Sequence, residues 1–355
     1  MKERWTKEQI WSWYNARPWV MGVNYCISVC AGSEYWQDDL HEEVMQTVRR
    51  ELDLMREIGV NGVRIFLPMN FWYHQRERFF DKLDALLGEL DARGMTLMPV
   101  IFNDCIGFER PACLMPPLPT GWNPYVIGHH SGQKANPFTG DKTRMGYCPW
   151  DDPENRPILR EYLTALLTRF GKDERIYAWD LWNEPGNTNR DDASIPYLEE
   201  AFALARSLDP VQPLTAGVWR YYKNPGEPLE TIAKKVIELS DIVTFHMYGR
   251  FEKVQMVVDY LEQFGRPMMN TEWLNRVLGN MMQDNLPLYH DKRIGSYSWG
   301  LVAGKMQHYL PWDNLYTDDP SLPLRRWQHD LFDVYHTPYD PEEIELMKRL
   351  SPAKT

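Results

Sequence analysis

Two glutamates stand out in the sequence because each follows a run of mostly apolar residues. Glu184 comes shortly after the run 176–181, and Glu272 comes directly after the run 268–271. Hydrolysis of a glycosidic bond requires two carboxyl groups facing each other across a cleft. One protonates the leaving oxygen, while the other attacks the anomeric carbon or activates water. Their pKa values must differ, which unequal surroundings can supply. We therefore take Glu184 and Glu272 as candidate catalytic residues.

Polar and aromatic side chains lie at the ends of similar runs elsewhere in the chain. Arg64 lies inside the run 63–67, where its guanidinium would favour the charged form of a neighbouring carboxylate. The other candidates for substrate contact are Asn103, Asp104, Asn183, Trp219, His246, Tyr248 and Trp299. Aromatic side chains make up 13% of the chain, and many of them lie in polar or Gly- and Pro-rich stretches. Rings exposed in a cleft suit flat ligand surfaces such as sugar faces.

The elements that must position these side chains form a repeating pattern. Eight strand-like apolar runs span residues 19–25, 63–67, 96–102, 176–181, 214–218, 242–246, 268–271 and 294–299. Apolar residues at helical spacing predict helices over residues 44–55, 79–90, 158–170, 197–208, 232–239 and 254–264. The strand-like runs are continuous rather than alternating, as expected of parallel strands buried on both faces.

This βα repeat fits either a (β/α)8 TIM barrel or a doubly wound sheet, and eight units in this length favour the barrel. No GxGxxG follows the first run and no GxxxxGK[ST] occurs, so a nucleotide-binding fold lacks its usual support. Catalytic residues of such barrels lie at the carboxyl ends of the strands. Glu184 after strand four and Glu272 after strand seven would then point into one cleft.

Three further segments complete the predicted architecture. Residues 2–16 predict an extra helix before the barrel that would plug its N-terminal face, and a last helix is predicted near residues 324–335. The segment 103–157, after strand three, is far longer than a usual βα loop, so we expect it to be functional. Because no linker or low-complexity tract is visible, we expect one domain over residues 1–355, with the barrel core at about 19–335.

The strand-end motifs resemble those of glycoside hydrolase clan A, and specifically family 5-like cellulases and mannanases. The segment 178–185, AWDLWNEP, resembles the strand-four motif that carries Asn-Glu-Pro. Thr271-Glu272-Trp273 resembles the strand-seven nucleophile motif, and segment 244–249, TFHMYG, resembles the strand-six pair. Arg64 and Trp299 match the strand-two arginine and the strand-eight tryptophan, so five elements agree in order across residues 19–300.

The resemblance implies a role for each matched residue. Glu184 would be the acid/base and Glu272 the nucleophile, with Arg64 and Tyr248 holding Glu272 ionised and oriented. Asn183 would hydrogen-bond the sugar 2-hydroxyl, His246 would line the site near the acid/base, and Trp299 would form the floor under the sugar. Retaining chemistry predicts a carboxyl separation of about 5–5.5 Å.

The sequence departs from this pattern after strand three. Many family 5 enzymes have a histidine there, whereas this chain has Asn103-Asp104, so recognition of the outer hydroxyls is expected to differ. His129-His130 in the long segment suggest metal binding, but no third ligand is identifiable from the sequence, and a solvated loop is the alternative. We expect no metal and no organic cofactor.

Composition limits the partners. The chain has 39 Lys and Arg against 50 Asp and Glu, a formal charge of −11, so no cationic excess exists to bind nucleic acid or an anionic membrane. The N-terminus has no apolar stretch typical of a secretory signal, and no apolar run is long enough to span a bilayer. Five cysteines without CxxC spacing suggest reduced thiols. We expect a cytoplasmic protein of undetermined oligomeric state.

We therefore expect a retaining glycoside hydrolase that acts on O-glycosidic, β-linked oligosaccharides or glycosides by double displacement. A cytoplasmic enzyme would not meet polymers, which favours exo action. The alternative within enzymes is an endo-acting cellulase, mannanase or xylanase. The alternative from another class is a carbohydrate-binding barrel without catalysis, which the presence of both glutamates disfavours. A metal-dependent barrel hydrolase is disfavoured because no strand-end HxH is present.

Overall fold

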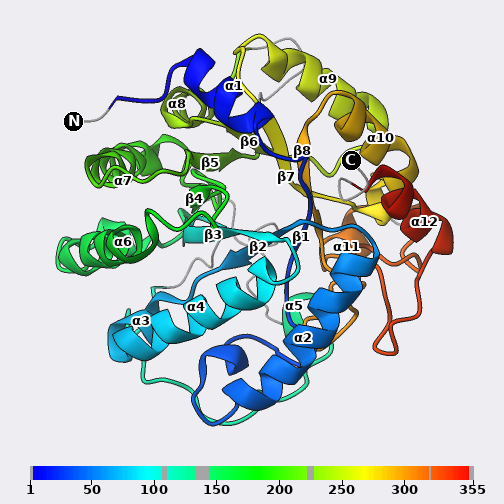
Figure 1. The fold of residues 1–355 in the computed structure, drawn as a ribbon, viewed down its shortest axis with the longest axis horizontal. Coiled ribbons are helices and arrows are strands. Elements are labelled where there is room, and N and C mark those ends of the chain that lie inside the picture. The colour runs from blue at the N-terminus through cyan, green and yellow to red at the C-terminus, as the bar shows by residue number, and fades with distance from the viewer. Residues whose placement is uncertain (1–2, 106–109, 133–143, 222–227, 320, 352–355) are drawn as a thin grey trace.

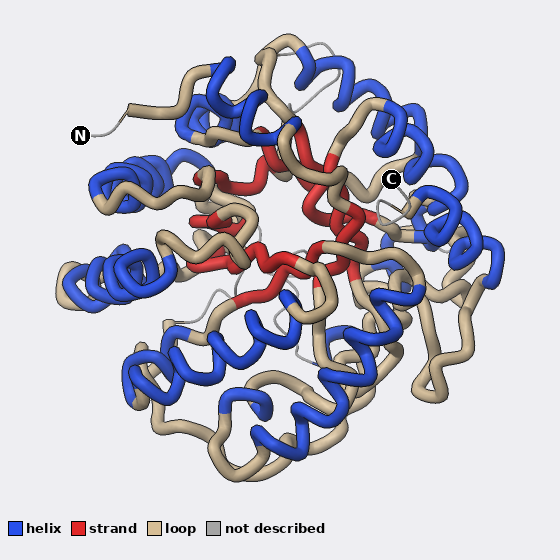
Figure 2. Tube along the Cα trace, in the orientation of Figure 1, coloured by secondary structure: helices blue, strands red, loops and turns tan. Residues whose placement is uncertain are grey.

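A computed structural model describes residues 3–105, 110–132, 144–221, 228–319 and 321–351 of the chain. Eight parallel strands close into a barrel in sequence order, with β8 paired to β1, and helices surround the barrel (Figure 1; Figure 2). The strands are β1 (Met21–Asn24), β2 (Gly62–Phe66), β3 (Thr96–Asn103), β4 (Trp179–Asn183), β5 (Leu214–Val218), β6 (Val243–His246), β7 (Met268–Trp273) and β8 (Gly295–Trp299). The predicted (β/α)8 fold is confirmed.

The helices between the strands cover the outer face of the barrel. The α-helices are α1 (Lys7–Asn15), α2 (His41–Glu57), α3 (Met69–His74), α4 (Arg76–Asp91), α5 (His129–Gly132), α6 (Arg156–Phe170), α7 (Ile195–Ser207), α8 (Thr231–Leu239), α9 (Phe251–Glu262), α10 (Met282–Asp291), α11 (Leu315–Asp318) and α12 (Pro341–Leu350). Short 3₁₀ turns lie at Glu34–Trp36, Pro149–Asp151, Asp191–Ser194 and Arg276–Leu278. None of the helices in the described ranges is long and apolar enough to span a bilayer.

Helix α1 closes the amino end of the barrel, as the sequence predicts. Thr6 caps this helix by accepting a hydrogen bond from the Gln9 backbone N–H. Ile10 and Tyr14 are buried against barrel residues such as Met98 and Tyr297. The Tyr14 hydroxyl also donates to the carbonyl of Arg293 at 2.8 Å. The apolar bottom of the barrel is thereby shielded from water.

The predicted helix near residues 324–335 is wrong. That segment instead runs as turns, and Phe332 forms isolated bridges with Val302 and Pro338. Gln328, His329 and Asp330 are buried there, and their side chains bind the loop backbone rather than facing solvent from a helix. The helical spacing of apolar residues in this segment predicted a helix, but the tertiary contacts of its buried polar residues favour turns instead. The last helix is α12, which begins at Pro341 with the Asp340 side chain as its cap.

The barrel is irregular at the carboxyl ends of the strands that carry the two glutamates. The pairing register shifts between Asp180 and Trp182 on β4, and between Asn270 and Trp273 on β7. Glu184, directly after β4, has a left-handed backbone with φ of 47°. Bulges and strained backbone of this kind are over-represented at active sites, because they redirect a side chain that regular pairing would aim elsewhere. The mouth of the barrel therefore has the irregular backbone that is common at active sites.

Candidate active site

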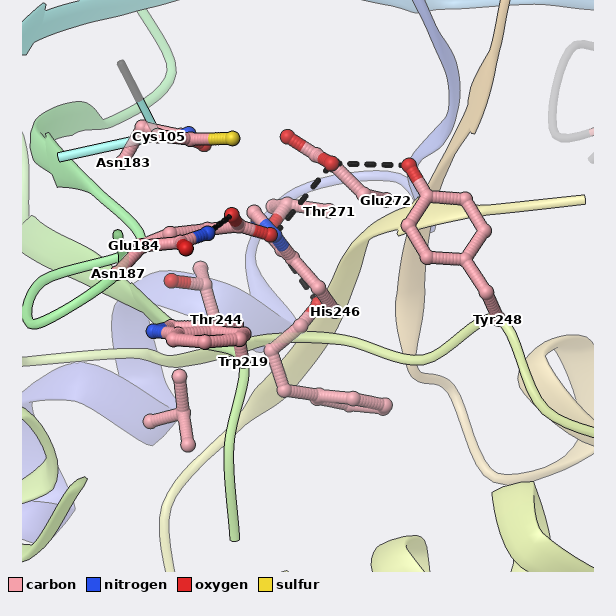
Figure 3. Close-up of polar contacts among 12 residues, drawn as sticks. Cys105, Asn183, Glu184, Asn187, Trp219, Thr244, His246, Tyr248, Thr271 and Glu272 are labelled. Carbon is pink, nitrogen blue, oxygen red and sulfur yellow. Dashed lines mark hydrogen bonds and ion pairs between the residues drawn. The ribbon is translucent and has the colours of Figure 1, made fainter. Parts of the chain in front are cut away.

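The two glutamates converge at the mouth of the barrel. One carboxylate oxygen of each, together with a ring nitrogen of His246, lies within 4.8 Å of the others. His246 Nδ1 lies 2.7 Å from Glu184 Oε1 and 3.4 Å from Glu272 Oε2. Figure 3 shows the two carboxylates turned toward each other with His246 beside them. Oxygens this close are compatible with the carboxyl separation of about 5–5.5 Å in a retaining pair.

Arg64 connects the strands below this pair. Its guanidinium is buried and donates to Asp180 Oδ2 at 2.8 and 3.0 Å, to Glu272 Oε1 at 2.9 Å and to Asn183 Oδ1 at 2.7 Å. A further bond of 2.8 Å goes to Asn24 Oδ1 on β1. A buried arginine needs such partners, because an unpaired charge in the interior is costly. Strands β1, β2, β4 and β7 are thus held in one fixed arrangement around Glu272.

Glu184 has the surroundings of a proton donor. Burial raises the pKa of Glu184 to about 7, while hydrogen bonds from Asn187 and Cys105 and the more distant charge of Arg64 lower it. Asn187 Nδ2 donates to Glu184 Oε2 from the turn that follows β4. A carboxyl with a pKa near neutrality is protonated in a large fraction of molecules at pH 7, as general acid catalysis requires.

Glu272 lies in a more polar environment than Glu184. Burial raises its pKa and the nearby Glu184 adds to the rise, but His246, Arg64 and the Tyr248 hydroxyl lower it. The Tyr248 hydroxyl donates to Glu272 Oε2 at 2.9 Å, and Arg64 binds Oε1. Both carboxylate oxygens therefore accept hydrogen bonds that favour the charged form. Arg64 is the only one of these partners that holds a permanent positive charge within hydrogen-bond distance.

His246 bridges the pair as a neutral ring. Burial lowers the pKa of His246 to about 4, so the imidazole carries one proton at pH 7. Gly217 on β5 leaves room for this ring, since a Cβ at that position would meet His246 Nε2 at 2.9 Å. A side chain larger than glycine would push the imidazole toward the carboxylates.

Asn103 and Asp104, which follow β3, have different surroundings. Asn103 Oδ1 accepts hydrogen bonds from Asn183 Nδ2 at 2.9 Å and from the Cys105 backbone at 2.8 Å, so it belongs to the network around the glutamates. Asp104 is fully buried, and its Oδ2 accepts from the Gly186 backbone at 2.8 Å. The Asp104 carboxylate thus fixes the turn after Glu184 instead of facing the cleft.

Aromatic rings border the mouth. Trp299 ends β8 and is half-buried, with the exposed ring of Phe66 at 6.2 Å between ring centroids. Trp219, after β5, donates from Nε1 to the Pro185 carbonyl at 3.1 Å, which ties the β5 loop to the turn that carries Glu184. The Tyr248 ring packs against Trp312 at 5.1 Å. These faces offer apolar surfaces on both sides of the carboxylates.

Three residues of the site were missed by sequence reasoning. Asp180 carried a signal, because it is a charged residue in the middle of an apolar run and such a residue needs a buried partner. Asn187 lies in a segment rich in Gly and Asn. Such residues indicate a turn, and nothing about Asn187 indicates contact with Glu184. Cys105 follows Asn103-Asp104 in sequence, and nothing in its spacing indicates that its thiol meets Glu184.

Two groups of side chains in the described ranges have ligand atoms close enough to hold a metal ion. One is Glu184, His246 and Glu272. The other is His129, His130 and His308, which lies beside Trp299. In the first group, the carboxylate oxygens already accept from Asn187, Arg64 and Tyr248. The second group supplies the third histidine that the sequence did not reveal.

Comparison with known proteins supports the predicted resemblance. No protein-family model matches the chain. The probable mannan endo-1,4-beta-mannosidase F of Emericella nidulans is 25% identical over 179 residues, which are 47% of this chain and 36% of that protein. The chain thus matches about a third of the length of this relative.

Solved structures share the fold over nearly the whole chain. A glycoside hydrolase family 5 mannosidase from Rhizomucor miehei has a TM-score of 0.56 at 15% identity and covers 95% of each chain. An exo-beta-1,4-mannosidase from Opitutaceae bacterium strain TAV5 has a TM-score of 0.58 at 17% identity, covering 95% of this chain and 59% of that one. The resemblance to family 5-like barrels of clan A is therefore confirmed at the level of fold.

Proposed function

We propose that this chain is a retaining glycoside hydrolase that cleaves β-linked glycosides by double displacement. The observation that carries the proposal is the Glu184–Glu272 pair, whose carboxylate oxygens approach within 4.8 Å in unequal surroundings. Glu272 accepts from Arg64 and Tyr248 and is the group better stabilised as an anion. Glu184, with a pKa raised to about 7, is the group better suited to carry a proton.

In the first step, Glu272 attacks the anomeric carbon while Glu184 protonates the departing oxygen, giving a covalent glycosyl-enzyme. In the second step, Glu184 removes a proton from water, and the resulting hydroxide displaces Glu272 from the sugar. His246 lies 2.7 Å from Glu184 and 3.4 Å from Glu272, so it contacts both groups whose charges change during the cycle. No step in this scheme requires a metal or an organic cofactor.

The surrounding residues receive roles that follow from their contacts. Asn183 is held by Arg64 and Asn103 and is suited to hydrogen-bond the sugar hydroxyl next to the reacting carbon. Trp299 provides a floor for the sugar ring, and Trp219 provides a second apolar face near Glu184. Asp104 is assigned to positioning the turn after Glu184 and not to substrate contact, because its carboxylate is fully buried.

The substrate class that we propose is a short β-mannoside or a related β-linked oligosaccharide, cleaved from one end. The relatives named above include an endo-acting and an exo-acting mannan enzyme, so similarity does not select the mode. Support for exo action comes from the segment after β3. The Ser131 backbone N–H donates to the Met306 carbonyl at 3.1 Å. The ring centroids of His130 and Trp299 lie 5.9 Å apart. These contacts hold the segment beside Trp299, where it would close one side of the cleft.

A cytoplasmic location is part of the proposal. All five cysteines are free thiols, as is usual for proteins in a reducing compartment. A cytoplasmic glycosidase meets oligosaccharides that have already been imported, which agrees with cleavage from one end of a short chain.

The test combines a variant of the proposed nucleophile and a variant of the proposed acid/base with a substrate panel. Aryl β-mannosides and β-glucosides would report exo action, and viscosity loss of soluble mannan would report endo action. Glu272→Ala should abolish turnover, and added azide should restore part of it with a glycosyl azide of inverted configuration. Glu184→Ala, the matched control, should give azide rescue with retained configuration. Full activity of Glu272→Ala would refute the nucleophile assignment, and sugar binding without turnover in the wild type would favour the non-catalytic barrel.

A further inference from the structure

Histidines from two distant loops meet beside the mouth of the barrel. His129 and His130 belong to the segment after β3, and His308 follows β8. Their ring centroids lie 4.5 to 5.3 Å apart, and one ring nitrogen of each lies within 4.8 Å of the other two. His129 and His308 are buried, and His130 is half-buried. Buried polar atoms are normally hydrogen-bonded, so each ring nitrogen of this buried cluster should have a partner.

The His129 ring has the hydrogen-bonding pattern of a metal ligand. Its Nδ1 lies 2.7 Å from the Leu310 carbonyl oxygen, which can only accept, so Nδ1 carries the proton. The lone pair is therefore on Nε2, which is buried and has no hydrogen-bond partner in the described part of the chain. Metal-bound histidines typically donate their other ring N–H to a backbone carbonyl in this manner, which fixes the tautomer and the ring orientation.

The spacing of the other two rings matches coordination of a small divalent ion. His308 Nε2 lies 3.1 Å from His130 Nδ1. Two nitrogens bound to Zn²⁺ at 2.0–2.1 Å in a tetrahedral arrangement lie about 3.3 Å apart. A neutral imidazole offers one ring-nitrogen lone pair to a metal ion, so the three rings can supply three ligand atoms.

The backbone around the two adjacent histidines is strained in a way that brings their rings together. His130 and Ser131 have left-handed φ values of 52° and 58°. Such conformations cost on the order of 1–3 kcal/mol each in non-glycine residues and persist only where other interactions hold them. Contacts from the β8 loop hold this turn, since the Gly128 backbone N–H donates to Gln307 Oε1 at 3.2 Å. A bound ion would offset the strain further.

We propose that His129, His130 and His308 bind one Zn²⁺ ion, which fastens the segment after β3 to the loop after β8 beside Trp299. Three neutral imidazoles form a set suited to Zn²⁺ or a similar transition metal, whereas Ca²⁺ and Mg²⁺ prefer oxygen ligands. The fourth position is left for water. The ion would fix the side of the cleft next to the sugar floor, because His130 and His308 both lie against the Trp299 ring. The site does not depend on the glycosidase assignment.

Metal binding by untagged protein tests this directly, because a polyhistidine tag would bind the same ions. The chain is stripped with EDTA, dialysed and titrated with Co²⁺, followed by competition with Zn²⁺ and measurement of bound zinc. We expect one equivalent, with visible Co²⁺ bands typical of tetrahedral coordination. Absence of stoichiometric binding in the folded wild type would overturn the proposal without recourse to any variant.

Variants identify the ligands. His308→Ala and His130→Ala should each lower the affinity by about 100-fold or more, since loss of an outer-shell partner alone typically costs 10- to 100-fold. The exposed His290→Ala is the matched control and should bind as the wild type does. Glu272→Gln should also retain the metal, which separates this site from the group of Glu184, His246 and Glu272. Loss of binding in Glu272→Gln, with retention in His130→Ala, would place the metal at the carboxylates and contradict the proposal.

Discussion

Replacing Asn187 by alanine is expected to move the alkaline limb of the pH–rate profile upward. Asn187 Nδ2 donates to Glu184 Oε2 and stabilises the ionised carboxylate, so its loss favours the protonated acid. A hydrogen bond to a charged group is worth about 1.5–3 kcal/mol, and one pKa unit corresponds to about 1.36 kcal/mol. The pKa of Glu184 should therefore rise from about 7 by about one to two units.

The assay is the pH dependence of kcat/KM on an aryl β-glycoside with a poor leaving group, for which protonation by Glu184 limits the first step. Activity falls as pH rises through the pKa of the acid in the free enzyme, so the wild-type midpoint should lie near 7. Asn187→Ala should move this midpoint to about pH 8–9. The near-isosteric Asn187→Asp should move it in the same direction, because a second carboxylate beside Glu184 disfavours the ionisation of Glu184.

A substrate with an activated leaving group serves as the control, since its departure does not need the acid. With that substrate, the alkaline limb should flatten in both the wild type and the variant. An alkaline limb that stays in place in Asn187→Ala, with circular dichroism unchanged, would refute the assignment of Glu184 as the titrating acid.

Three further outcomes follow from the same geometry. Glu184→Gln should raise the free energy of unfolding at pH 8 by about 3 kcal/mol, or Tm by roughly 4 °C. The reason is that ionising Glu184 destabilises the folded protein at any pH above the pKa of the unfolded carboxyl, because folding raises that pKa. At pH 4 the carboxyl is protonated in the folded protein, so the variant and the wild type should have the same Tm. Tyr248→Phe removes a 2.9 Å donor from Glu272, so the acid limb of kcat/KM should shift upward, and an unchanged limb would contradict that role. Gly217→Ala places a Cβ 2.9 Å from His246 Nε2 and should lower kcat/KM about 10- to 100-fold with little loss of folding, as checked by thermal melting.

The barrel itself was readable from the sequence because its strands are buried on both faces. Continuous apolar runs mark such strands without any need to know their partners. The runs 63–67 and 214–218 correspond closely to β2 and β5. The spacing of apolar residues predicted a helix at 324–335, where polar residues are in fact buried by distant contacts. It predicted no helix at α10, which contains Pro287.

The sequence by itself determined which residue types stand at the strand ends, and thus that Glu184 and Glu272 would share a mouth with Arg64. The resemblance indicated Arg64, Tyr248 and His246 as neighbours of the pair, but not the other groups that touch it. Burial raises the pKa of both glutamates, and the Asn187 amide and the Cys105 thiol at Glu184 and His246 at Glu272 lower it again. Likewise, His308 meets His129 and His130 only because the barrel brings the β3 and β8 loops together. Hydrogen bonds, pKa shifts and metal coordination depend on distances between side chains. Those distances are fixed only when the sheet closes into a barrel, so they cannot be read from the sequence alone.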